Sequence, residues 1–159
     1  MKEKFLALID IVVTEHLFDR YPQASSGQLS WMRSRSVCAP SLTLIAIREL
    51  NLHKLVLYNN PELGKEISYY VNILDACSYS DMTERGWKYD PPKVISDLTE
   101  SVFGAMFLDS RYDYEQLKVT VLRIFKDLLA VVTPDLPKDP SAELLVWVTK
   151  QGCRKTHFR

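Results

Sequence analysis

The sequence lacks several features that would assign a role from composition alone. Its three cysteines are spread along 159 residues, without the spacing of a metal site or the paired framework of a disulfide scaffold. This usage fits a reducing compartment, so we expect an intracellular protein of the cytoplasm or nucleus. There is no signal-peptide pattern and no apolar run long enough to cross a membrane, so no membrane partner is expected.

An excess of charge is also lacking. The 20 basic and 20 acidic side chains balance, so the whole molecule has no electrostatic attraction to nucleic acid. Any binding surface for a polyanion must therefore be a local patch, and two basic segments exist, 29–55 and the acid-free tail 144–159. Scattered basic side chains are ordinary on surfaces, but these segments supply the candidate contacts Arg33, Arg35, Lys150, Arg154 and Lys155.

What remains is an ordinary composition, 47% hydrophobic and 25% charged, enough to build the core of one domain. Apolar residues recur mostly at helical spacing, which predicts an all-α fold. We expect helices over 5–18, 29–37, 42–50, 62–77, 91–109, 113–132 and 141–150, with a polar loop over 78–90. Three prolines in 134–140 predict a stiff linker.

The stretch 91–109 has the most specific pattern. Its apolar side chains are expected to form a buried stripe, namely Val94, Leu98, Val102, Ala105 and Met106. Asp97 and Glu100 fall on the other side with Lys93 and Gly104, and two carboxylates this close repel each other. A cation such as Mg²⁺ would relieve the repulsion, although the spacing by itself favours an ordinary solvated face. Gly104 costs the helix about 1 kcal/mol relative to Ala, so its retention indicates a need for space.

The pattern Lys93-x-x-x-Asp97-x-x-Glu100-Ser101-x-x-Gly104-Ala105-x-x-x-Asp109 resembles the second signature motif of ribonuclease III, in the form seen in Dicer-like proteins. The resemblance covers roughly residues 5–145. It implies a ribonuclease III-like helical fold and cleavage of double-stranded RNA. It also implies Asp97 and Glu100 as ligands of a catalytic Mg²⁺, with Mn²⁺ as a substitute. Lys93 is implied as a third catalytic residue, typical of Dicer-type domains.

The first signature motif of that family is incomplete in this chain. The family pattern is Glu-Phe-Leu-Gly-Asp-Ala, two apolar residues, then Asp, whereas this chain has Lys4-Phe5-Leu6-Ala7-Leu8-Ile9-Asp10. The Gly-Asp pair is missing and Lys4 stands in place of the glutamate. Asp10 matches a family position outside the metal shell. We therefore expect weak metal binding and reduced catalysis.

The resemblance also implies domains and partners. We expect a ribonuclease III domain over 1–133, the linker over 134–140, and the truncated start of a double-stranded-RNA-binding domain over 141–159. The expected partners are double-stranded RNA and either a second copy or another ribonuclease III domain. Two alternatives stay open: an inactive module of the same fold for RNA binding or dimerisation, and an unrelated all-helical interaction protein.

Overall fold

The computed structural model describes residues 2–151, except for the side chains of residues 2–5 and 87. Every regular element in this part of the chain is helical, which confirms the all-α prediction. In chain order they are α1 (Lys2–Arg20), α2 (Ser26–Val37), α3 (Ala39–Arg48), the 3₁₀ turn η1 (Leu52–Lys54), α4 (Pro61–Ala76), α5 (Tyr79–Arg85), the 3₁₀ turn η2 (Gly86–Lys88), α6 (Lys93–Asp109), α7 (Tyr114–Ile124), α8 (Lys126–Val131) and α9 (Pro140–Lys150). None of these described helices combines the length and hydrophobicity that crossing a membrane requires.

Local capping explains where several of these helices begin. The Ser25 side chain accepts from the amide of Gln28, whose own side chain bonds back to Ser25, forming a capping box at α2. Ser78 and Asp81 form a second capping box, which starts α5. The prediction of a loop over 78–90 was therefore wrong. Its polar composition hid a short helix whose amides are satisfied by these two side chains.

The helix predicted over 113–132 is broken at Phe125, which ends α7 and precedes α8. The Phe125 ring is fully buried and meets the ring of Phe103 on α6 at a centroid distance of 5.9 Å. Apolar periodicity continues across the break because Leu128 and Leu129 also face the core. Periodicity alone therefore predicted one helix where the structure has two.

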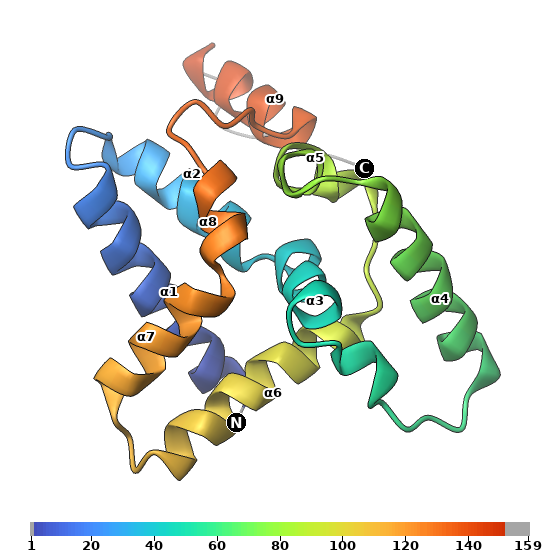
Figure 1. Cartoon of the computed structure of the whole chain (residues 1–159). Helices are drawn as coiled ribbons and strands as arrows, with labels where there is room; N and C mark the ends of the chain where they lie inside the picture. The colour runs from blue at the N-terminus through green and yellow to red at the C-terminus, as the bar shows by residue number, and fades with distance from the viewer. Residues whose placement is uncertain (1, 152–159) are drawn as a thin grey trace.

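Helix α6 runs through the core and packs against α3, α1 and α7 (Figure 1). Its buried face consists of Ile95, Thr99 and Phe103, with the neighbouring Ser96 and Gly104. The Thr99 hydroxyl donates to the main-chain carbonyl of Leu42 on α3 at 3.1 Å, so this polar side chain is satisfied inside the core.

The predicted buried stripe of α6 was only partly right, because Leu98 and Val102 are half-buried and pack against the core but its other three members are exposed. Val94 and Met106 are each 36% exposed, and Ala105 is exposed as well. Gly104, expected on the open side with the carboxylates, is buried. Because Ser96 and Thr99 are polar, the sequence pattern did not mark their face as the one that meets the core.

The linker is anchored to the body of the domain. Leu136 is buried, and the side-chain amide of Gln28 donates to the carbonyl of Pro134 at 3.2 Å. Just before the linker, the Tyr21 hydroxyl donates to the carbonyl of Val132 at 2.9 Å. Helix α9 follows and lies at the opposite end of the view from α6 (Figure 1), with Trp147 exposed. The turn and strand predicted beyond α9 lie outside the described residues.

Candidate functional site

Lys93, Asp97 and Glu100 lie on successive turns of α6 and form its charged face. Lys93 is the first residue of the helix, and its Nζ donates to Oδ1 of Asp97 at 3.0 Å. The Lys93 side chain is 85% exposed, whereas the Asp97 side chain is only 18% exposed. Glu100 is half-buried. The lysine therefore covers a largely enclosed carboxylate from the solvent side.

These three groups act on one another electrostatically. The hydrogen bond to Asp97 raises the pKa of Lys93, and the negative charges of Asp97 and Glu100 raise this pKa further. Lys93 is thus firmly protonated at neutral pH. The side chains that the sequence predicted as a catalytic set are brought together by the structure as one charged cluster.

The donor set of this cluster suits a hard divalent cation. Carboxylate oxygens are the ligands that Mg²⁺ prefers, and Mg²⁺ commonly keeps several waters while using one or two carboxylates and substrate phosphates. Asp97 and Glu100 fit that pattern as a site with two protein ligands. Within residues 6–151, no third acidic, histidine or cysteine side chain completes a larger group around them. Asp10 lies elsewhere, with its Oδ1 3.8 Å from Nη1 of Arg33 on α2.

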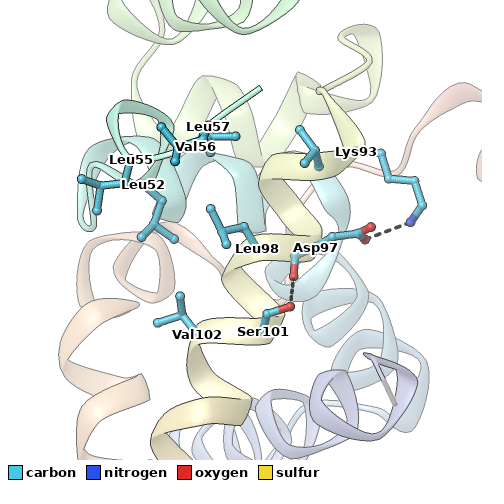
Figure 2. Close-up of a pocket in the computed structure, with 10 residues that line it drawn as sticks. Leu52, Leu55, Val56, Leu57, Lys93, Asp97, Leu98, Ser101 and Val102 are labelled. Carbon is cyan, nitrogen blue, oxygen red and sulfur yellow. Dashed lines mark hydrogen bonds and ion pairs between the residues drawn. The ribbon is translucent and has the colours of Figure 1, made fainter. Parts of the chain in front are cut away.

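An open apolar groove of about 850 Å³ adjoins the charged face of α6 (Figure 2). One wall is the segment that contains Leu52, Leu55, Val56 and Leu57, and the other is the side of α6 that bears Val94, Leu98 and Val102. Lys93 and Asp97 lie at its polar edge, as Figure 2 shows.

Sequence reasoning missed this groove. Within the apolar run from Leu55 to Tyr58, Leu55 is 71% exposed and Leu57 is 98% exposed. The sequence pattern that could have predicted the groove is this run of four consecutive apolar or aromatic residues in a loop, where side chains are usually exposed. Patches of this kind mark interaction surfaces.

The predicted basic contacts are not brought together. Arg33 is 42% exposed, whereas Arg35 is buried and donates through Nε and Nη2 to the carbonyl of Thr83 at 3.0 and 2.7 Å. We infer that Arg35 holds α5 in place. Lys150 is exposed at the end of α9, away from α6 (Figure 1), while Arg154 and Lys155 lie outside the described residues.

Arg48, also in the basic segment 29–55, is likewise used inside the domain. Its guanidinium donates to the carbonyls of Leu74 and Cys77 at the end of α4, and it lies over the ring of Tyr79 at 5.0 Å. Composition marked this segment as a basic patch, but two of its arginines satisfy helix-terminal carbonyls. The exposed charge available to a polyanion there is correspondingly smaller.

Comparison with known proteins agrees with this architecture. The Ribonuclease III domain family model matches residues 6–111. The chain is 38% identical to Endoribonuclease Dicer homolog 2 of Arabidopsis thaliana over 156 residues, covering 96% of this chain and 10% of that protein. It is 32% identical to Protein Dicer of Schizosaccharomyces pombe over 151 residues, covering 92% of this chain and 11% of that protein.

A shorter relative, Ribonuclease 3-like protein 3 of Arabidopsis thaliana, is 27% identical over 155 residues, covering 94% of this chain and 16% of that protein. The chain thus spans about a tenth of the length of the Dicer relatives that it matches. The matched region includes α6 with Lys93, Asp97 and Glu100, and ends just after that helix. On the length of this match, the chain belongs to the ribonuclease III domain family.

Proposed function

We propose that this domain is a metal-dependent endonuclease of double-stranded RNA, of the kind that processes RNA in Dicer-type proteins. The observation that carries the proposal is the cluster of Lys93, Asp97 and Glu100 on one face of α6, beside an exposed apolar groove. Family membership and the names of the relatives support the substrate class.

Each residue of the cluster has a chemical role in this proposal. Asp97 and Glu100 would hold Mg²⁺, or Mn²⁺ in its place, through their carboxylate oxygens. The chemistry that a bound ion would supply there is activation of a water and compensation of negative charge on the phosphate and leaving oxygen. Lys93, exposed at the start of α6, would contact a phosphate of the substrate. The wide, shallow groove of duplex RNA would be recognised by shape and 2′-hydroxyls rather than by sequence.

The apolar groove is the proposed pairing surface. Leu57, almost completely exposed, would be buried by a second copy of this chain or by another ribonuclease III domain. Pairing would place a second charged cluster near the first, so that each domain cuts one strand of the duplex. Because the groove shares Lys93 and Asp97 with the charged face, pairing and RNA cleavage would occur side by side.

The incomplete first motif lowers the activity that we expect. Lys4 replaces a carboxylate with a positive charge, and the missing Gly-Asp pair removes a further ligand. With only Asp97 and Glu100 as matched ligands, the metal would be held weakly. The alternative function is therefore an inactive module that binds RNA or dimerises, and the exposed apolar groove is the observation that favours it.

The remaining sequence expectations are part of the same proposal. We propose a ribonuclease III domain over 1–133, a linker over 134–140, and the start of a double-stranded-RNA-binding domain over 141–159. Arg33 and Lys150, both with exposed charge, are the proposed auxiliary RNA contacts among the described residues.

The test is cleavage of a long, end-labelled double-stranded RNA with Mg²⁺, comparing the wild-type chain with Glu100→Ala. Cleavage that Glu100→Ala abolishes would support a working site on α6. A folded, helical wild-type protein that binds duplex RNA or dimerises without cutting would support the inactive module instead. Cleavage that persists in Glu100→Ala would refute the assignment of the site.

A further inference from the structure

Lys93 occupies an unfavourable position for a residue that serves only helix stability. It is the first residue of α6, where the helix dipole presents partial positive charge. No side chain caps this helix start, because the N-cap residue is Pro92. A lysine four residues before an aspartate is also the weaker order for an ion pair along a helix. Helix stability alone therefore does not account for a cation at this position.

The geometry shows what the ammonium does instead. Lys93 Nζ lies 3.0 Å from Oδ1 of Asp97, in direct contact with a carboxylate that is otherwise largely covered (Figure 2). The lysine reaches it from solvent, the side from which a hydrated cation would also approach. A metal ion bound to Asp97 would therefore approach the carboxylate that the ammonium already contacts, and from the same side.

We propose that Lys93 acts as an internal counter-ion that competes with a divalent cation for Asp97. This inference rests on the proposed function, in which Asp97 and Glu100 hold the metal. Its consequence is that Lys93 has two opposed effects, because it lowers metal affinity while offering its charge to the RNA phosphate. Removal of the ammonium would thus tighten metal binding even where it impairs cleavage.

The expected size of the effect follows from Coulomb's law. An ammonium repels a divalent ion twice as strongly as it repels a monovalent ion at the same distance, and this repulsion weakens as the distance grows. The exposed lysine can swing away, and salt screens the remainder. We therefore expect an affinity gain of about tenfold for Lys93→Met at low salt, and a smaller gain at high salt.

The experiment is a titration with Mn²⁺, read by electron paramagnetic resonance of the free ion, without RNA. The variants are Lys93→Met, the charge-preserving Lys93→Arg, and Lys93→Met combined with Asp97→Asn. Lys65→Met is the matched control, because Lys65 also forms an exposed ion pair within one helix, with Glu62 at 2.7 Å on α4. Circular dichroism establishes that each variant is folded.

The proposal predicts tighter Mn²⁺ binding only for Lys93→Met, with Lys93→Arg and Lys65→Met close to wild type. Adding Asp97→Asn should remove the gain. Binding by Lys93→Met that is no tighter than wild type, or an equal gain in Lys65→Met, would overturn the proposal. Because the readout is binding, it is separate from the cleavage test, and a chain that fails to cut RNA can still show or lack this competition.

Discussion

Arg35→Met tests whether a predicted RNA-binding residue serves the fold instead. In the structure, the Arg35 guanidinium is buried and donates two hydrogen bonds to the carbonyl of Thr83. That carbonyl belongs to the last turn of α5, where carbonyls have no partner within the helix. Methionine keeps much of the aliphatic stem but removes both donors. The Thr83 carbonyl would then be buried without this partner.

The magnitude follows from the unpaired carbonyl. A buried polar group left without a hydrogen bond costs about 1–3 kcal/mol, and removal of the buried charge offsets part of this loss. We expect the free energy of unfolding to fall by about 2 kcal/mol. In a domain of this size that corresponds to a melting temperature lower by roughly 4–8 °C.

The assay is urea unfolding followed by far-ultraviolet circular dichroism, with duplex-RNA binding measured on the same samples. Arg33→Met is the matched control, since Arg33 lies on the same helix, α2, but is 42% exposed. Arg35→Met should destabilise the domain and leave RNA affinity of the folded protein unchanged, whereas Arg33→Met should do the reverse. An Arg35→Met protein as stable as wild type, with weakened RNA binding, would refute the assignment.

Two further predictions concern pairing and pH. Leu57→Asp should abolish self-association, or pairing with another ribonuclease III domain, in analytical ultracentrifugation. The control Val119→Asp, at a residue that is 66% exposed on α7, should not affect pairing. Equal behaviour of the two variants would exclude the groove as the pairing surface. Burial lowers the pKa of His16 and His53 below 6.5 in the folded state. As the pH drops through 6.5, these histidines therefore take up protons more readily in the unfolded chain than in the folded one, and the free energy of unfolding should fall. Urea unfolding at stepped pH should show this loss, and His16→Gln should reduce it; a wild-type profile that is flat down to about pH 5 would contradict the reasoning.

Much of the fold follows from local sequence information. Ser25 and Gln28 mark the start of α2, and Asn60 caps α4, because short side chains satisfy the first amides of a helix wherever the chain places them. Side-chain capping also accounts for α5, which lies in the segment predicted to be a loop. Its capping pair, Ser78 and Asp81, is visible in the sequence, but the polar composition of the segment is also typical of a loop.

The sequence by itself determined the all-α class, the family resemblance, and the placement of Lys93, Asp97 and Glu100 on one face of one helix. Spacing along a helix fixes which side chains share a face, whatever surrounds that helix. Only the tertiary structure decided which face of α6 meets the core. Thr99 is buried because its hydroxyl finds the carbonyl of Leu42, 57 residues away in sequence.

The roles of Arg35 and Leu57 were decided in the same way. Composition grouped Arg35 with surface charge, and only the approach of α5 supplies the carbonyl that holds it in the interior. Leu57 belongs to an apolar run that could equally have been buried, but no helix within residues 2–151 covers it. Contacts between distant segments cannot be read from periodicity, because periodicity records only the relation of a residue to its own helix.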